Sequence, residues 1–66
     1  MCEAHAYLLS AAGQQQIMQN VIRVSYDGDD VVLTDLFGDE RRLRARIKEI
    51  ALLDHRIYLE EADDRA

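Results

Sequence analysis

Cys2 is the residue of this chain whose position offers the most specific chemistry. It directly follows Met1, and a small second residue generally permits removal of the initiator methionine. The α-amine and the thiol of Cys2 would then lie on adjacent carbons and could close a five-membered chelate ring on a metal ion. The backbone amide nitrogen of Glu3 adds a third donor, and this planar nitrogen and sulfur set suits Ni(II) or Cu(II). If Met1 is retained, its α-amine and the Cys2 amide nitrogen remain available beside the thiolate.

Other interpretations of these residues stay open. Free cysteine is among the most buried residue types, and Cys2 shares one face of a predicted strand with Ala4 and Ala6, which is typical of a small core residue. His5 is the next candidate ligand, but it falls on the opposite face because successive side chains of a strand point to opposite sides. His5 could reach the same metal only if the terminus frays or another chain contributes; otherwise it is a surface histidine. His55 lies in a predicted turn without a ligand set around it.

The elements that would position these residues are short strands. Residues 2–9 alternate between two faces, which predicts a first strand. Residues 17–26 are rich in β-branched side chains, and residues 31–37 begin with an apolar run. The sequence Asp27-Gly28-Asp29-Asp30 between them is a strong turn signal, so these two segments are expected to form a hairpin.

The chain after Arg41 is ambiguous. Leu43, Ile47 and Ile50 have helical spacing, whereas residues 47–53 and 56–60 fit a hairpin closed around Asp54-His55. The short, closely spaced strands elsewhere favour an all-β fold, either a small barrel or a sandwich.

The chain is short and acidic. Its 66 residues carry 8 Lys and Arg against 13 Asp and Glu, a formal charge of −5. A domain of this size usually relies on a disulfide, a metal or a partner chain, and a single cysteine excludes an internal disulfide. No apolar stretch is long enough to span a membrane and no signal peptide is evident, so a cytoplasmic protein is expected. No catalytic triad or phosphate loop is present, so we expect no enzyme.

A basic segment runs from Arg41 to Lys48 and holds five of the eight basic residues. Its guanidinium groups could contact RNA phosphates while Tyr7, Tyr26, Phe37 or Tyr58 stacks on bases. A small RNA-binding barrel is therefore the alternative function. Against it stands the acidic net charge, and a charge run of this kind is ordinarily a solvated face paired with acidic residues.

With these residues described, the chain resembles the CooT family of carbon monoxide dehydrogenase accessory proteins. The resemblance lies in the Met1-Cys2-Glu3 start that leads directly into a strand, and in the near-identical total length. The Leu36-Phe37 pair followed by acidic residues matches as well, and so does a hairpin from Ile47 to Glu61.

The resemblance implies a small SH3-like barrel of short antiparallel strands, with at most a helical turn near Arg44 to Arg46. The barrel would span residues 1–61, followed by a short polar tail at 62–66. It also implies a homodimer that binds Ni(II) through Cys2, and a metallochaperone-like role in supplying nickel to carbon monoxide dehydrogenase or another nickel enzyme. The neighbouring apolar residues Val21-Ile22 and Leu52-Leu53 make both faces of their segments apolar, so one face could pack against a partner chain.

Overall fold

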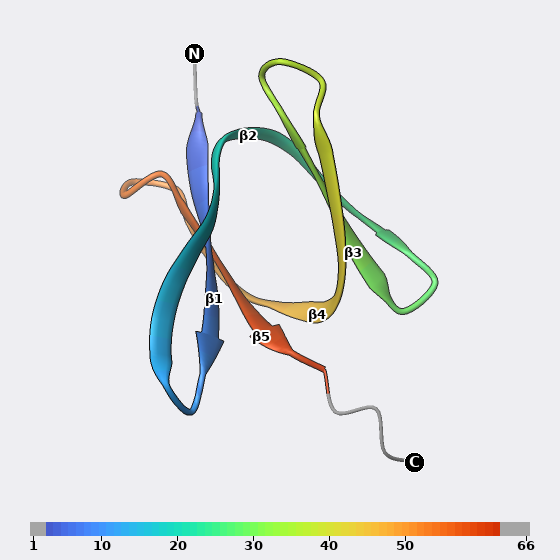
Figure 1. Ribbon diagram of the computed structural model, residues 1–66. Helices are drawn as coiled ribbons and strands as arrows, with labels where there is room; N and C mark the ends of the chain where they lie inside the picture. Colours follow the sequence, from blue (N-terminus) through green and yellow to red (C-terminus); the bar gives the residue numbers. More distant parts are fainter. Residues whose placement is uncertain (1–2, 63–66) are drawn as a thin grey trace.

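Five β-strands and no helix make up the part of the chain that the computed structural model describes, residues 3–62 (Figure 1). In chain order the strands are β1 (Ala4–Ser10), β2 (Gly13–Asp27), β3 (Asp30–Asp35), β4 (Glu40–Ala51) and β5 (Arg56–Glu61). The all-β prediction is confirmed. Met1, Cys2 and the last four residues of the expected polar tail lie outside the described residues.

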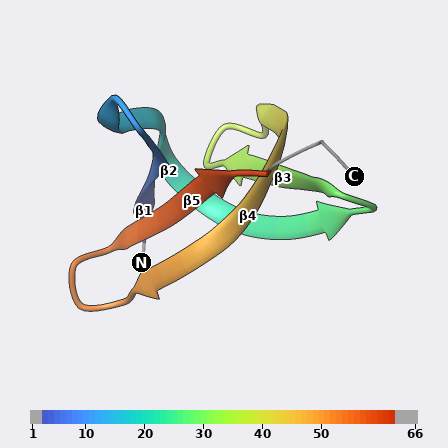
Figure 2. The same cartoon turned by 90° about the horizontal axis from the view of Figure 1, so that it is seen from below.

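The strands form one closed barrel in the order β1-β2-β3-β4-β5. Sequential neighbours pair antiparallel, and β5 returns beside β1 as a parallel partner, with Ala6 opposite Ile57. Seen from below, β5 lies between β1 and β4, so the last strand completes the ring (Figure 2). The expected small barrel is therefore confirmed, with one parallel pair among the antiparallel ones.

The two long strands each pair with two neighbours in turn. The first half of β2 pairs with β1 and its second half with β3, and Val21 is the residue at which the partners change. Asn20, just before this point, has a φ of 56°, a left-handed conformation that lets the strand bend there. In β4, Arg44 pairs with β3 and Ala45 with β5.

The ambiguous segment after Arg41 is therefore part of a continuous strand. Residues 44–46, where the sequence left room for a helical turn, carry ladder pairs to β3 or β5. The backbone groups of these residues are hydrogen-bonded to neighbouring strands. The helical spacing of the apolar side chains carries no information about this pairing. The hairpin that follows is confirmed, although β4 ends at Ala51 and the turn takes residues 52–55.

Two turns are fixed by local backbone chemistry. Gly28 alone has positive φ in the two-residue loop between Asp27 and Asp30, which is the pattern of a type II′ hairpin turn. Between β3 and β4, one carboxylate oxygen of Asp35 accepts the backbone N–H groups of Phe37 and Asp39, both at 2.9 Å. These bonds end β3 at Asp35, so Leu36 and Phe37 lie in a turn rather than at the end of the predicted strand.

The barrel interior is filled by small and branched apolar side chains from all five strands. Ala6, Val31, Leu33, Ala45 and Leu59 are fully buried. Ala4 and Leu8 pack against this core from the same face of β1 as Ala6, so the predicted alternation of the first strand is confirmed. The outward face of β1 is thus left for His5, Tyr7 and Leu9.

Candidate metal centre at the N-terminal end of the barrel

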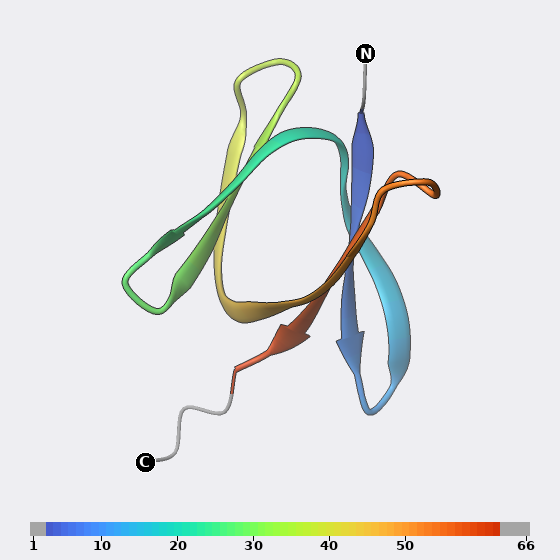
Figure 3. The ribbon, with the colours of Figure 1, turned by 180° about the vertical axis from the view of Figure 1, so that it is seen from behind.

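The residues that carry the predicted metal chemistry precede β1 in the sequence. Cys2 and Met1 lie outside the described residues, and the description begins at the half-buried Glu3. The start of β1, the β3–β4 turn and the β4–β5 turn lie toward one end of the barrel, while the β1–β2 turn and the end of β5 lie toward the opposite end (Figures 1 and 3). We call the first of these the N-terminal end, made of residues 3–5, 20–22, 35–39 and 52–55.

Three hydrogen bonds join these four segments across the N-terminal end. The backbone N–H of His5 donates to the carbonyl of His55 at 2.9 Å, and that of Asn20 donates to Nδ1 of His5 at 3.5 Å. The backbone N–H of Leu36 donates to the Asn20 carbonyl at 2.9 Å. His5 and Asn20 therefore connect both turns to the strand that bears the Cys2 motif.

The side chain of His5 is half-buried and contacts the bend of β2. Because Nδ1 accepts the Asn20 N–H, the neutral ring of this geometry carries its proton on Nε2. Neither ring nitrogen then offers a lone pair to a metal ion while this bond is kept. This argues against His5 as a preformed ligand.

No other side-chain cage lies nearby. Among residues 3–62 there is no group of three or more His, Cys, Asp or Glu side chains placed to hold a metal ion. His55 is exposed in the β4–β5 turn, where its φ is 56° and its backbone N–H donates to the Leu52 carbonyl at 3.2 Å. Residues 3–62 of one copy therefore contain no preformed site of three such side chains.

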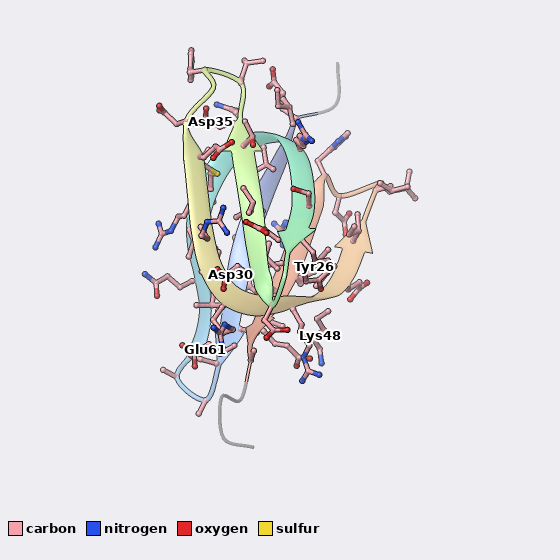
Figure 4. All side chains as sticks on the ribbon, turned by 90° about the vertical axis from the view of Figure 1, so that its right-hand side faces the viewer. Tyr26, Asp30, Asp35, Lys48 and Glu61 are labelled. Carbon is pink, nitrogen blue, oxygen red and sulfur yellow. The ribbon has the colours of Figure 1, made fainter. Side chains whose placement is uncertain are left out.

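The basic segment is largely engaged in contacts within the chain. Arg42 forms ion pairs with Asp27 at 2.7 Å and Asp30 at 3.5 Å, and Arg44 pairs with Asp30 at 3.2 Å. The hydrogen bond to Asp27 is the largest cause that raises the pKa of Arg42 above its ordinary value. Figure 4 shows Asp30 on β3 beside β4. This arrangement favours a solvated, ion-paired face over an RNA-binding surface.

All three tyrosines proposed for base stacking also have partners in the barrel. The rings of Tyr7 and Tyr58 stack with centroids 5.8 Å apart, and the Arg56 guanidinium lies 5.3 Å from the Tyr7 ring centre. The Tyr26 hydroxyl accepts the backbone N–H of Ile47 at 2.9 Å. Of the four candidates, Phe37 has an exposed ring without such a contact.

A shallow open hollow lies away from the N-terminal end, beside the end of β1 and the last residues of β5. It is lined by Leu9, Ser10, Lys48, Glu60 and Glu61, two of which Figure 4 labels. Its mixed charges and open shape give no sign of a defined ligand.

A family model described as the CO dehydrogenase accessory protein CooT matches residues 1–60. The chain belongs to the CooT family. The match includes Cys2 and extends through almost all of β5, so it covers the whole closed barrel rather than one hairpin. CooT is an accessory protein to an enzyme and is not itself the catalyst.

Two archaeal relatives of this CooT chain span nearly its whole length, and a third matches about two thirds of it. An uncharacterised protein of Methanocaldococcus jannaschii is 33% identical over 60 residues, which is 91% of this chain and 98% of that protein. A second, from Methanothermobacter thermautotrophicus, is 30% identical over 96% of this chain and 94% of its own length. A third, from Archaeoglobus fulgidus, is 40% identical over 43 residues, covering 65% of this chain and 96% of the relative.

A solved structure agrees with the fold. The crystal structure of a protein from Carboxydothermus hydrogenoformans assigned to CooT superposes with a TM-score of 0.86 at 31% identity. The superposition covers 94% of this CooT chain and all of the other. In the described part of the chain, no helix has the length and apolar character that crossing a membrane requires.

Two features of the N-terminal end differ in how far the sequence indicates them. Nothing in the sequence around Asn20 distinguishes it as the bend of β2, because the bend depends on contacts with β1 and β3. The adjacent apolar pairs Ile22 with Val21 and Leu52 with Leu53 did carry a signal, and the structure buries Val21 while exposing the other three.

Proposed function

We propose that this CooT protein binds Ni(II) through the thiolate of Cys2 and delivers it during maturation of a nickel enzyme, with carbon monoxide dehydrogenase as the client. The observation that carries the proposal is the position of Cys2, inside the family match and two residues before the start of β1. The family's description as an accessory to CO dehydrogenase supports the client.

The donors at the start of the chain suit nickel chemically. A thiolate selects a softer transition metal over magnesium or calcium, and amine or amide nitrogens beside it favour a planar site. With Met1 removed, the donors are the Cys2 amine, the Cys2 thiolate and the Glu3 amide nitrogen. With Met1 retained, the donors are the Met1 amine, the Cys2 amide nitrogen and the Cys2 thiolate. His5 is an additional candidate only if its bond to Asn20 opens.

A single thiolate per chain favours a homodimer. Two copies can place two thiolates on one ion, whereas residues 3–62 of one copy contain no side-chain cluster able to complete the site. The small core of a 66-residue chain also gains stability from a partner. We therefore propose one nickel ion shared by two chains, in a cytoplasmic protein whose lone cysteine stays reduced.

Release to a client is compatible with the fold. The proposed ligands precede β1, and among residues 3–62 the first member of the buried core is Ala6. Loading and unloading of the metal therefore need not disturb the packing of the barrel. The nickel ion is cargo in this proposal, and the client's own ligands would take it over.

The test is a Ni(II) titration that compares the wild type with Cys2→Ser, followed by the thiolate-to-nickel absorption band and by calorimetry. Serine is also small, so removal of Met1 should be the same in both proteins, and intact mass verifies this. The matched control is the double variant Cys2→Ser/Ser10→Cys, which moves the thiol to the exposed far end of β1. We expect nickel affinity to fall at least 100-fold in Cys2→Ser and to stay low in the double variant. Equal affinity in wild type and Cys2→Ser would refute the proposal.

A further inference from the structure

One edge of the second half of β4 has no strand beside it. Residues 45–51 pair with β5 on one side, and the pairs of β4 with β3 end at Arg44, so within residues 3–62 their other side is open. We call this side the β4 edge. On β2, residues 22–27 pair with no strand other than β3, because the pairs with β1 end at Val21. We call their open side the β2 edge.

Ile47 shows that the β4 edge directs backbone groups away from β5. Its N–H donates to the Tyr26 hydroxyl of β2 at 2.9 Å, across the interval between the two edges (Figure 4). In a strand the N–H and the C=O of one residue point to the same side, so the Ile47 carbonyl faces the same way. A tyrosine side chain is longer than the spacing of about 4.8 Å between paired strands, so the two edges stand too far apart to pair with each other. Both backbone groups of Ile47 are therefore within reach of an added strand.

Apolar side chains border the two edges. Of the seven large hydrophobic residues exposed within residues 3–62, three lie here: Ile22 at 52%, Tyr26 at 51% and Ile50 at 49%. β2 runs from the N-terminal end toward Tyr26, and β4 runs from Ile47 back to that end, so Ile22 and Ile50 lie toward the same end of the two edges. About half of each side chain is packed on the barrel, and the other half is surface that the side chains of an added strand would cover.

The charges along the two edges favour an acidic partner. Arg23 and Lys48 are exposed and make no hydrogen bond or ion pair within residues 3–62, whereas every other Lys or Arg there contacts a carboxylate, a carbonyl or a tyrosine. Asp27 of β2 is engaged by Arg42, which leaves Glu49 as the single free carboxylate of the two stretches. Two free cations against one free anion attract acidic side chains, although the whole chain has a formal charge of −5.

We propose that the β4 edge binds an extended, acidic segment of a partner protein, which adds to the barrel as a further strand beside residues 45–51. A carbonyl of the added strand replaces the Tyr26 hydroxyl as the acceptor of the Ile47 N–H. Acidic side chains of the segment lie near Lys48 and Arg23, and its apolar side chains cover the exposed ones of the two edges. Without a partner, the Tyr26 hydroxyl keeps the Ile47 N–H bonded. The proposal is independent of the proposed function, because none of these residues is a proposed nickel ligand.

The experiment uses a synthetic probe, a capped peptide of about seven residues in which glutamate alternates with valine. Two matched peptides carry lysine in place of glutamate, or methyl groups on alternate backbone nitrogens of the acidic sequence. Calorimetry measures affinity at about 150 mM NaCl, where charges more than about 8 Å apart are largely screened. Amide chemical shifts locate the bound peptide. We expect the acidic peptide to shift amides of residues 22–27 and 45–51, and both matched peptides to bind at least fivefold more weakly.

The Tyr26→Phe variant gives a readout that a non-specific contact would not change. In the wild type the added strand must displace the hydroxyl from the Ile47 N–H, whereas phenylalanine has no such bond to lose, so the acidic peptide should bind about fivefold more tightly. Circular dichroism verifies that the variant is folded.

Charge variants test the acidic preference. The double variant Arg23→Ala/Lys48→Ala should bind the acidic peptide at least fivefold more weakly than the wild type. Its matched control is Ala11→Asp/Ala12→Asp, which lowers the net charge by the same two units at the exposed β1–β2 turn and should leave binding unchanged. The proposal is overturned if the acidic peptide does not bind at millimolar concentration, if the lysine peptide binds as well, or if Tyr26→Phe leaves the affinity unchanged.

Discussion

The hydroxyl of Tyr26 in β2 accepts the backbone N–H of Ile47 in β4, at 2.9 Å. In this part of β4, residues 45–51 pair with β5 and not with β3, so one edge of the strand has no strand partner among residues 3–62. Tyr26 lies beside this open edge (Figure 4). A guanidinium nitrogen of Arg41 makes the equivalent contact on β2, donating to the Ile17 carbonyl at 3.1 Å. The side chains of Tyr26 and Arg41 thus bond to backbone groups of β4 and β2, the two strands that bend from one partner to the next.

The Tyr26→Phe substitution should lower the free energy of unfolding by about 1 kcal/mol, because it removes the acceptor of the Ile47 N–H while keeping the ring. Tyr58→Phe is the matched control, since its hydroxyl contacts only an exposed Arg56 nitrogen at 3.4 Å. Urea unfolding followed by circular dichroism measures both. A loss in Tyr58→Phe as large as that in Tyr26→Phe would contradict a specific role for the edge contact.

Asn20 should be replaceable by glycine but not by residues with a branched Cβ. Its φ of 56° costs an L-residue about 1–2 kcal/mol, and asparagine and glycine tolerate this region best. We expect Asn20→Gly to unfold at nearly the wild-type urea midpoint and Asn20→Val to lose about 1–2 kcal/mol. The neighbouring exposed position offers a control, because Gln19→Val introduces the same side chain in ordinary strand geometry. A Gln19→Val loss equal to that of Asn20→Val would rule out the backbone explanation.

The carboxylate of Asp35 should stabilise the β3–β4 turn. Asp35→Ala leaves the N–H groups of Phe37 and Asp39 without their side-chain acceptor, so we expect a loss of about 1 kcal/mol in unfolding free energy. Asp35→Asn retains an acceptor oxygen, so its free energy of unfolding should be close to that of the wild type. Amide hydrogen exchange at Phe37 and Asp39 gives the local measurement: it should accelerate in the alanine variant. Unchanged exchange at both amides in Asp35→Ala would disprove the turn's dependence on this side chain.

Nickel affinity should increase with pH. The thiol, with an ordinary pKa of about 8.5, must lose its proton to bind, as must the amine near 8. Each proton released below its pKa raises the apparent affinity about tenfold per pH unit, and the number of protons is measured by calorimetry in buffers of different ionisation enthalpy. Cys2→Ser should release one proton fewer. An affinity that does not change between pH 6 and 8 would exclude thiolate binding.

Local signals in the sequence predicted some elements well. The alternation of β1 was visible because it depends on which side chains face the core, and the hairpin at Gly28 was visible because the turn needs glycine at positive φ. The end of β3 was missed by two residues, since an aspartate that accepts its own turn's N–H groups resembles any polar strand residue. The continuous β4 was missed as well, because the helical spacing of its apolar residues is equally compatible with a bent strand.

The candidate site shows the same contrast: features that depend on local sequence could be predicted, and contacts between distant residues could not. The prediction of Cys2 as a metal ligand rests on its position next to Met1 in the sequence, which requires no tertiary structure. It could not show that His5 is engaged by Asn20, because that contact joins residues fifteen positions apart. Nor could it show that two turns, separated in the chain by most of β4, present Phe37 and Leu53 toward the same end of the barrel.

The parallel pairing of β1 with β5 has a consequence for how the protein is made. β5 fills the space between β1 and β4, so no shorter stretch of the chain can close the barrel. During translation the first strand is synthesised early and must wait for the last one, with both neighbouring edges open in the meantime. A chain that ends before Arg56 would therefore leave one edge of β1 and one edge of β4 without a strand partner.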